Sequence, residues 1–336
     1  MTESNDIAII GAGLSGLILA QQLAATHQVQ VFEKSRGLGG RLATRYAEPY
    51  QFDHGVHSFK AKSTAFQAYL YPLQQAGLIV PWNADTVEIQ ADKTIIASTD
   101  TQPDYVGVPK MNQIGKYLAE GMSIERQTRI TAIQGTAGAW MLQTDTGAEH
   151  GPYDWVISTA PPEQSAAILP PGCLPEVQDV PMDGCYVMML GFADPLPIEW
   201  ELAHVQHDAI HRIILNHTKP GRPAGYSMVV HSTKAWAETY SAAKNDWVLQ
   251  QLVDMASDVV QHDLSQAVHT DIHQWRYATS EKPLIPINNI DTQNQIAVCG
   301  DWCQQGDVES AYQMAIRVAG DILRALNLRP VDTEIR

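Results

Sequence analysis

The chain has 336 residues, enough for one large domain or two modest ones, and its 45% hydrophobic content is ordinary for a globular protein with a full core. The 37 acidic and 22 basic side chains give a formal net charge of -15. Such a surface would repel phosphate backbones and anionic membranes. The composition therefore argues against nucleic acid and membranes as partners.

No stretch reaches the roughly 18 uncharged apolar residues of a membrane span. The opening residues, MTESNDIAII, lack the basic and apolar regions of a signal peptide. The four cysteines form no CxxC pair and no disulfide framework, as expected in a reducing compartment. We therefore expect a soluble cytoplasmic protein.

A glycine-rich loop follows a short apolar strand at residues 7–10 and precedes a helical stretch over residues 17–26. This is GxGxxG in the context that it requires. The first glycine allows a tight turn, the second lets the backbone approach a pyrophosphate, and the third permits close helix packing, while the helix N-terminus faces the phosphates. The pattern predicts dinucleotide binding by Gly11, Ala12, Gly13, Leu14, Ser15 and Gly16.

A second strand, residues 29–32, ends in an acid at Glu33. About 20 residues after the first glycine, such a carboxylate can accept hydrogen bonds from an adenosine ribose. The alternative, a glycine turn that only packs strand on helix, is weakened because strand, glycines, helix and acid occur together. We include the adjoining Lys34 in the predicted site.

A second glycine turn, RxxGGR, follows at Arg36, Gly39, Gly40 and Arg41. Adjacent glycines let the chain pass close to a cofactor, and guanidinium groups pair with phosphate oxygens. The turn resembles the second glycine motif of flavoproteins in the glutathione reductase and amine oxidase superfamily, where it lies along the diphosphate and ribityl chain. A simple nicotinamide dehydrogenase needs no such element, so the motif favours FAD. The alternative is a surface turn with two solvated arginines.

The stretch FDHGVHSF, residues 52–59, reads as a strand that runs into a loop. In the same superfamily a D-x-G stretch at this distance brings backbone beside the isoalloxazine. The resemblance implies that Gly55, Val56 and His57 lie beside the flavin.

Residues 296–309, IAVCGDWCQQGDVE, read as an apolar strand, a turn and the start of a helix. Free N–H groups at the helix start, around Val308 and Glu309, would stabilise the negative charge of reduced flavin, and Asp301, beside Gly300, could bond a ribityl hydroxyl. Strand, Gly-Asp, turn and helix match the third FAD motif of this superfamily. We interpret Cys299 and Cys303 as ordinary buried thiols rather than a flavin tether or redox pair.

Between these motifs a helix is predicted over residues 108–118 and strands over 123–134, 139–144 and 154–158. The fold class is therefore α/β, with a Rossmann-like FAD-binding domain of the glutathione reductase and p-hydroxybenzoate hydroxylase type and a smaller mixed α+β substrate domain. Ile130 and Thr159 are included in the cofactor site. We assign residues 1–59, 106–164 and 288–329 to the FAD-binding domain, and residues 60–105 and 165–287 to the substrate domain.

The chain resembles the renalase family of the FAD-dependent amine oxidase superfamily, in particular its bacterial branch, from end to end. The resemblance rests on FEKSRGLGGRLATR, FDHGVHSFKAK, VGVPKMNQIGKYLA, KPGR, MVVHST, QWRYA and CGDWCQQGDVESA. It implies a non-covalent FAD oxidase that converts the misreduced 2- and 6-dihydro isomers of NAD(P)H to NAD(P)+, with dioxygen reduced to hydrogen peroxide. It also implies that Asn216, His231 and Trp275 surround the dihydropyridine ring and its carboxamide.

The chain departs from the family beside the flavin. Where the family has D-x-G-A-Q and then an aromatic residue, His57 replaces the glutamine and Ser58 a tyrosine. These changes bear on substrate preference rather than on FAD binding. From the residues alone, His57 could instead be a filler and His231 a satisfied core histidine.

Dihydropyridine oxidation suits a site without an evident general base, because hydride transfer removes no acidic proton and the protein chiefly orients two rings. Two alternatives remain open. An amine oxidase or desaturase would show a lysine near flavin N5 with an aromatic cage, and no motif locates such a pair. A redox sensor would bind flavin without turnover. The spacing of His204, His207 and His211 could serve a metal only on one helix face, and we predict no metal.

Overall fold

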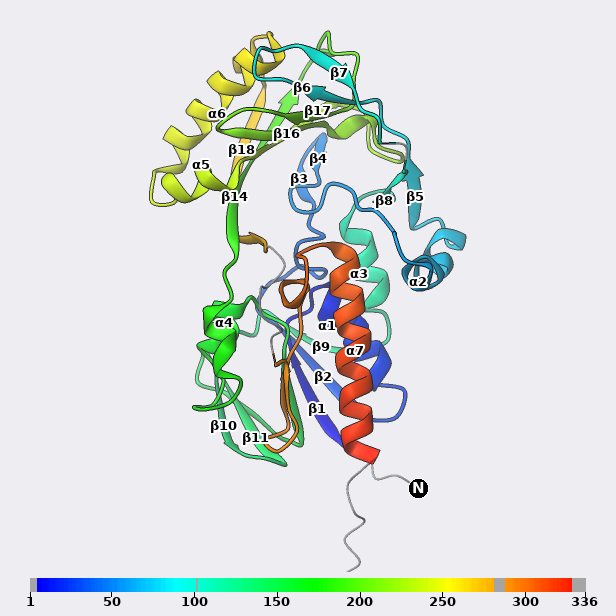
Figure 1. Cartoon of the computed structure of the whole chain (residues 1–336), viewed down its shortest axis with the longest axis vertical. Coiled ribbons are helices and arrows are strands. Elements are labelled where there is room, and N and C mark those ends of the chain that lie inside the picture. The colour runs from blue at the N-terminus through cyan, green and yellow to red at the C-terminus, as the bar shows by residue number, and fades with distance from the viewer. Residues whose placement is uncertain (1–4, 101, 281–287, 328–336) are drawn as a thin grey trace, which may run out of the picture. The chain divides into compact units, whose positions relative to one another are not determined.

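A computed structural model describes residues 5–100, 102–280 and 288–327 (Figure 1). The chain divides into two compact units: the first unit comprises residues 1–40, 115–181 and 280–336, and the second unit residues 41–114 and 182–279. The second unit thus takes in residues 41–59 and 106–114 of the predicted FAD-binding domain, and the first takes in 165–181 of the predicted substrate domain. Residues 281–287 and 328–329 of the predicted domains lie outside the described residues.

The first unit is built on a sheet with the strand order β19-β20-β13-β1-β2-β9. All neighbours in it are parallel except β19 and β20. Strands such as Ile7–Ile10 and Trp155–Ser158 are buried runs of apolar residues, as expected for a parallel sheet covered on both faces. The bounds are β1 Asp6–Ile10, β2 Gln28–Glu33, β9 Ser123–Arg126, β13 Trp155–Ser158, β19 Ile290–Asp291 and β20 Ile296–Val298.

Two helices, α1 (Leu14–Leu23) and α7 (Val308–Asn327), pack against each other in the first unit (Figure 1). Small residues on α7, among them Ala315 and Ala319, are buried at this contact side. The unit also holds a small antiparallel sheet, β10-β11-β12. Its bounds, and those of the shorter elements, are β10 Ile130–Thr136, β11 Ala139–Thr144, β12 Glu149–Tyr153, α4 Pro162–Ala166, η1 Pro175–Asp179 and η4 Asp301–Cys303.

The single strand predicted over residues 123–134 is wrong. Residues 123–126 pair with β2 in the parallel sheet, whereas residues 130–136 pair with β11. Gln127, between them, has a positive φ of 58°. The alternation of residues across this segment therefore conceals a sharp turn between two sheets.

The second unit is built on a large sheet with the order β18-β14-β17-β16-β15-β6-β7, in which only β15 and β6 run parallel. Its strands are β6 Thr86–Ile89, β7 Ile95–Ala97, β14 Asp183–Phe192, β15 Leu202–Val205, β16 Ile210–Leu215, β17 Tyr226–Ser232 and β18 His269–Thr279. The remaining elements are β3 Arg45–Ala47, β4 Tyr50–Phe52, α2 Thr64–Gln75, β5 Ile79–Trp82, β8 Asp104–Gly107, α3 Asn112–Leu118, η2 Asn216–Thr218, α5 Lys234–Thr239, α6 Asn245–Val260 and η3 Leu264–Gln266.

The two faces of the large sheet have different partners. One face, which we call the helix face, packs Met188 and Leu190 against α5 and α6. The opposite face packs Val187 and Met189 against Tyr50 and other residues of the β3-β4 hairpin region, and we call it the hairpin face. Figure 1 places the helices and the hairpin on opposite sides of this sheet. Alternate residues of each strand thus reach different environments.

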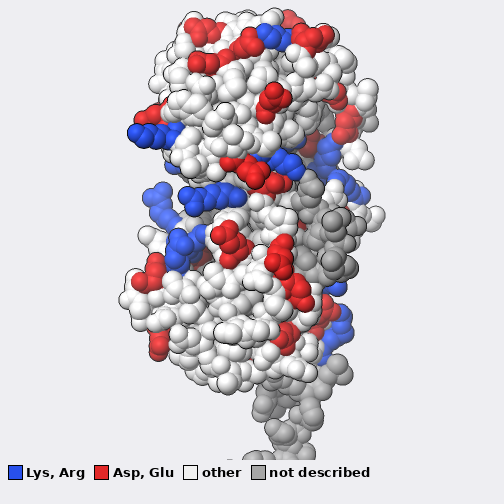
Figure 2. Space-filling view, turned by 60° about the vertical axis from the view of Figure 1, so that its left-hand side comes forward, with Lys and Arg blue, Asp and Glu red and all other residues white. Residues whose placement is uncertain are grey.

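No helix among the described residues combines the length and apolar character needed to cross a bilayer. Acidic side chains are scattered over the visible face rather than gathered on one element (Figure 2). On this face the acidic charge is therefore distributed rather than concentrated in one patch (Figure 2).

Candidate functional site

The first glycine loop joins β1 to α1, as predicted. Gly11 has a positive φ of 109°, and a Cβ on Gly16 would lie 2.0 Å from the carbonyl oxygen of Gly11. Neither position tolerates a side chain. The Thr159 hydroxyl donates to the carbonyls of Ile10 and Gly11, at 3.0 and 3.1 Å. Thr159 therefore supports the loop from the end of the neighbouring strand.

The second glycine turn lies directly against the first. The Gly39 amide donates to the carbonyl of Ala12 at 2.8 Å, and a Cβ on Gly40 would lie 3.1 Å from the Gly13 Cα. On the other side, a Cβ on Gly115 would lie 2.5 Å from the Gly39 Cα. Gly39 and Gly40 of the RxxGGR turn thus allow three backbone segments to lie close together, in addition to any approach to a cofactor.

Glu33 is buried at the end of β2, where its carboxylate is tied to the glycine loop. Oε2 accepts the amide of Ala12 at 2.8 Å, and Oε1 accepts that of Ser35 at 2.7 Å. Each oxygen keeps a second lone pair for a ribose hydroxyl. Ile130 begins β10 close by, since the Thr128 amide donates to the carbonyl of Glu33. The exposed Lys34 donates to a side chain of α4, Gln164.

The third motif has the predicted form of strand, turn and helix. Helix α7 begins at Val308, and the Asp307 carboxylate accepts the Ser310 amide at 2.7 Å as a cap. Asp301 is buried in η4 after Gly300, and Glu309 is buried in the first turn of α7. The Ser15 hydroxyl donates to the carbonyl of Ala311, which links the first glycine loop to this helix.

Cys299 and Cys303 are free thiols. Burial raises the pKa of Cys303 to about 12 and that of Cys299 well above its usual value. Both sulfurs are therefore protonated, as expected of inert buried thiols.

These residues fit the dinucleotide part of FAD. The α1 N-cap, Gly13, has no capping side chain, so the first-turn N–H groups are available to phosphate, and nothing lies within 4 Å of a Cβ built on Gly13. Arg36 is exposed.

Arg41 belongs to the second unit, where its guanidinium donates to the carbonyl of Ala278 at 2.9 Å. A Cβ on Gly55 would lie 1.9 Å from the Arg41 carbonyl oxygen, which also accepts the Val56 amide.

One row of side chains crosses the large sheet on its hairpin face. From β18 to β15 the row consists of His273, Val187, His231, Arg212 and His204, each paired in register with the next. Directly paired residues of antiparallel strands share a face, so these side chains are neighbours. A band of histidines and one arginine thus crosses a face that elsewhere carries apolar side chains such as Met189 and Val229.

The loop after β4 brings His57 onto this row. Arg212 Nη1 lies 3.2 Å from His57 Nε2, and the rings of His57 and His231 meet edge to face at 5.6 Å. His231 Nε2 and Arg212 Nε are buried, and neither has a hydrogen-bond partner within the part of the chain that the structure describes. The structure therefore brings together two predicted site residues around an arginine that was not predicted.

Trp275 forms a second part of the same face. Its indole N–H donates to the carbonyl of His54 at 2.7 Å, and its ring stacks on that of His54 at 5.4 Å. His273 meets the indole at 4.5 Å. The plane of Trp275 is therefore fixed by two imidazoles and a hydrogen bond.

Asn216 belongs to a buried ion network instead. Its amide nitrogen donates to the carbonyl of Gln51 at 2.8 Å, and its Oδ1 accepts Lys219 Nζ at 2.8 Å and the Asp53 amide at 3.4 Å. The Asp53 carboxylate accepts both Lys219 and Arg222. Since Asn216 is fully buried and its oxygen already accepts two donors, its contacts favour a positioning role.

Burial governs the protonation of the site histidines. It lowers the pKa of His54 to about 4 and the pKa values of His57 and His231 well below the usual value. Burial also lowers the pKa of Arg212, but a guanidinium remains charged at neutral pH. The site therefore presents neutral imidazoles around one cation.

Arg212, His54 and His273 were not predicted as site residues. His269, Asp271, His273 and Trp275 occupy every second position of β18, but Thr270, Gln274 and Arg276 between them are also polar, so this strand carries no clear polar–apolar alternation. The network of Asp53, Lys219 and Arg222 joins residues more than 160 positions apart and has no local signal.

His204 and His211, considered as part of a metal site, lie on strands β15 and β16 rather than on one helix. Among the described residues no group of histidine, cysteine and acidic side chains is arranged to hold a metal ion.

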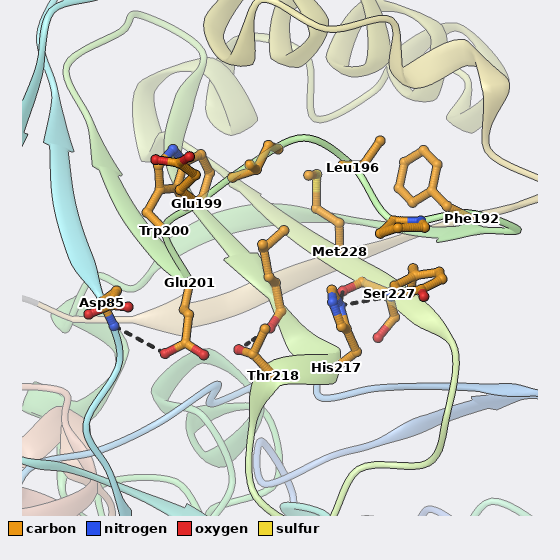
Figure 3. Close-up of a pocket in the computed structure, with 14 residues that line it drawn as sticks. Asp85, Phe192, Leu196, Glu199, Trp200, Glu201, His217, Thr218, Ser227 and Met228 are labelled. Carbon is orange, nitrogen blue, oxygen red and sulfur yellow. Dashed lines mark hydrogen bonds between the residues drawn. The ribbon is translucent and has the colours of Figure 1, made fainter.

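A cavity of about 270 Å³ lies in the second unit (Figure 3). Trp200 and Met228 contribute apolar walls, and Asp85, Glu201 and His217 contribute polar groups. The Asp85 amide donates to Glu201, and His217 bonds backbone atoms of Ser227. Met228 belongs to the helix-face core, so this cavity is distinct from the row on the hairpin face.

Comparisons with known proteins agree with this fold. A family model described as an NAD(P)-binding Rossmann-like domain matches residues 9–71. A curated 4,4'-diapophytoene desaturase (4,4'-diaponeurosporene-forming) from Staphylococcus haemolyticus is 46% identical over 50 residues, which span 15% of this chain and 10% of the desaturase. The family model thus covers the region of the two glycine turns. The match to the desaturase covers only a small part of either chain.

Solved structures match over nearly the whole chain. Cyclohexylamine oxidase from Brevibacterium oxydans has a TM-score of 0.75 at 13% identity, covering 97% of this chain and 100% of that one. A putative protoporphyrinogen oxidase from Exiguobacterium has 0.72 at 14%, covering 96% and 100%. Putrescine oxidase bound to putrescine has 0.70 at 13%, covering 96% and 100%. The predicted fold class is confirmed: the chain is a mixed α/β protein with a Rossmann-like nucleotide-binding domain, and it shares its fold with these oxidases.

Proposed function

We propose that the protein is an FAD-dependent oxidoreductase, and specifically an oxidase of the 2- and 6-dihydro isomers of NAD(P)H. The cofactor proposal is supported by the three motifs and by the fit of the residues around Gly13 and Glu33 to a dinucleotide. Bound non-covalently, FAD would accept a hydride from the dihydropyridine at N5 and pass its electrons to dioxygen, yielding NAD(P)+ and hydrogen peroxide.

The observation that carries the substrate proposal is the chemistry of the hairpin face. Neutral imidazoles and an indole offer flat walls and hydrogen bonds, and the buried cation beside them is Arg212. Dihydropyridine oxidation needs orientation rather than proton removal. In this proposal Trp275 walls the ring, the unpartnered Nε2 of His231 bonds the ring substituent, and Asn216 positions the loop that carries Asp53.

Amine oxidation is the second candidate, because two of the similar folds are amine oxidases by name. Lys219 is the buried lysine that such chemistry could recruit. Its ammonium group, however, bonds Asp53 and Asn216, and the neighbouring hairpin face holds the cation of Arg212. A substrate ammonium group would be repelled there.

Anaerobic mixing of the holoprotein with single substrates tests the proposal. The flavin band near about 450 nm would be followed after addition of 2-dihydro-NAD, 6-dihydro-NAD, ordinary NADH or a panel of simple amines, because bleaching reports hydride arrival. Rapid bleaching by a dihydro isomer, with NAD+ formed, is the expected result. Bleaching by an amine alone would contradict it and favour the second candidate.

A further inference from the structure

Arg212 occupies the centre of the row on the hairpin face. It lies on β16, paired with His231 on β17 and with His204 on β15. The residue as a whole is partly exposed, while its Nε is buried. This charged group lies on a face that also carries apolar side chains, such as Ile214 on β16 and Val229 on β17.

The guanidinium is poorly satisfied by the protein. Among the described residues its hydrogen bonds run from Nη1 to the ring of His57, and Nε has no partner. An arginine has five N–H donors in a planar fork. Beside it, the Nε2 atom of His231 is also buried without a partner. Because residues 212 and 231 are paired in register, these two unpartnered nitrogens belong to neighbouring side chains on one face.

Arg212 has no direct ion-pair partner among the described residues. None of the ion pairs found in the described chain includes it, in contrast to Lys219 and Arg222, which share Asp53. Asp104 and Cys185 are the groups that favour its charged form. Neither forms an ion pair with it, and burial raises the pKa of Cys185 to about 11, so that sulfur is a neutral thiol. A partly buried cation without an ion-pair partner is unfavourable.

We propose that Arg212, with His231 and His57, binds a carboxylate group carried by the substrate. This inference rests on the proposed function and refines it: the preferred dihydropyridine bears a carboxylate where nicotinamide bears a carboxamide. The guanidinium fork matches the two oxygens of a carboxylate, and a neutral imidazole can donate a further hydrogen bond. A neutral carboxamide would leave the cation unpaired.

Nicotinate and nicotinamide are matched probes, because they share one ring and differ in this group alone. Their binding to the oxidised holoprotein would be measured by calorimetry and by perturbation of the flavin spectrum. We expect nicotinate to bind at least about tenfold more tightly, which corresponds to one charge-assisted hydrogen-bond pair. Equal affinities of the unmodified holoprotein for the two probes, or tighter binding of nicotinamide, would overturn the proposal.

Variants then test the residue. Arg212→Gln should abolish the preference, and Arg212→Lys, which keeps the charge but loses the fork, should reduce it several-fold. Arg276→Gln, an exposed arginine on β18, is the matched control and should retain it. Retention of the full preference by Arg212→Gln, with normal FAD content and urea midpoint, would exclude Arg212 as the anion-binding group.

The binding experiment can fail independently of the proposed function. If nicotinate is preferred but no dihydropyridine bleaches the flavin, the carboxylate site stands and the oxidase proposal fails. If dihydro-NAD isomers bleach the flavin while nicotinate has no advantage, the oxidase proposal stands and the carboxylate site is refuted.

Discussion

The ammonium group of Lys219 lies 3.1 Å from the carboxylate of Asp53, and both side chains are completely inaccessible to solvent. Arg222 donates to the same carboxylate oxygen. Burial alone would raise the pKa of Asp53, but the two cations hold it below its usual value. Burial lowers the pKa of Lys219 to about 8. One acid therefore compensates two buried bases.

Replacing Asp53 by asparagine should destabilise the protein by about 3–5 kcal/mol, because two cations remain buried without a counter-charge. The free energy of unfolding in urea measures the effect. Lys93→Met, which removes the exposed pair with Asp258, is the control and should cost at most about 1 kcal/mol. A similar small loss for Asp53→Asn would mean that the network is not the stabilising feature that its burial indicates.

Stability should fall as the pH decreases from 6.5 toward 4. The pKa of His54 is about 4 in the folded protein and 6.5 ordinarily, so in this window the unfolded chain binds a proton that the folded chain does not. The free energy of unfolding then decreases by at most about 1.4 kcal/mol per pH unit for each such histidine. Urea titrations across the window measure the slope, and His54→Gln should flatten it. An unchanged slope in that variant would assign the effect to other groups.

Gly13→Ala should weaken FAD binding by about tenfold or more, because its methyl group would fill the space through which the backbone approaches the pyrophosphate. Nothing in the protein lies within 4 Å of that methyl, so the apoprotein should keep its thermal midpoint. Gly37→Ala, which also meets nothing within 4 Å, is the control and should bind FAD normally. The measurement is the flavin content of each variant after dialysis. Equal flavin content in Gly13→Ala and Gly37→Ala would contradict the predicted phosphate site.

His231→Ala should lower kcat/KM for the dihydropyridine substrate about tenfold, the usual cost of one neutral hydrogen bond, with unchanged FAD content. His262→Ala, at the end of α6 and outside the hairpin face, should leave kcat/KM unaltered. Steady-state oxygen consumption with the two variants is the measurement. Wild-type kinetics in His231→Ala would indicate that this residue is a core histidine rather than a substrate-binding group.

The glycine loops could be read from the sequence because their signals are local. Gly11, Gly16 and Glu33 sit at fixed offsets within one strand-turn-helix unit, and the structure gives each a contact that explains its identity. The start of α7 at Val308 was predictable for the same reason, since strand, turn and helix follow one another without interruption.

The hairpin face could not be read in this way. Arg212 meets His231 because β16 and β17 pair in one register, and His57 arrives from a loop 155 positions earlier. Sheet register depends on the packing of the whole unit, so a strand pattern shows which residues share a face but not which of them meet. The role of Asn216 was obscured for the same reason, because its partners Gln51 and Asp53 come from β4 and the loop after it.

The order in which strands join the first-unit sheet has a consequence for biosynthesis. Its strand β20 and the helix that packs on α1 come from residues 296–327, whereas the large sheet is complete once residue 279 has been made. On the ribosome, the second unit can therefore close its core while the first unit still lacks two strands, β19 and β20, and helix α7. We expect truncated chains ending near residue 280 to contain a protease-resistant second unit and an unprotected first one.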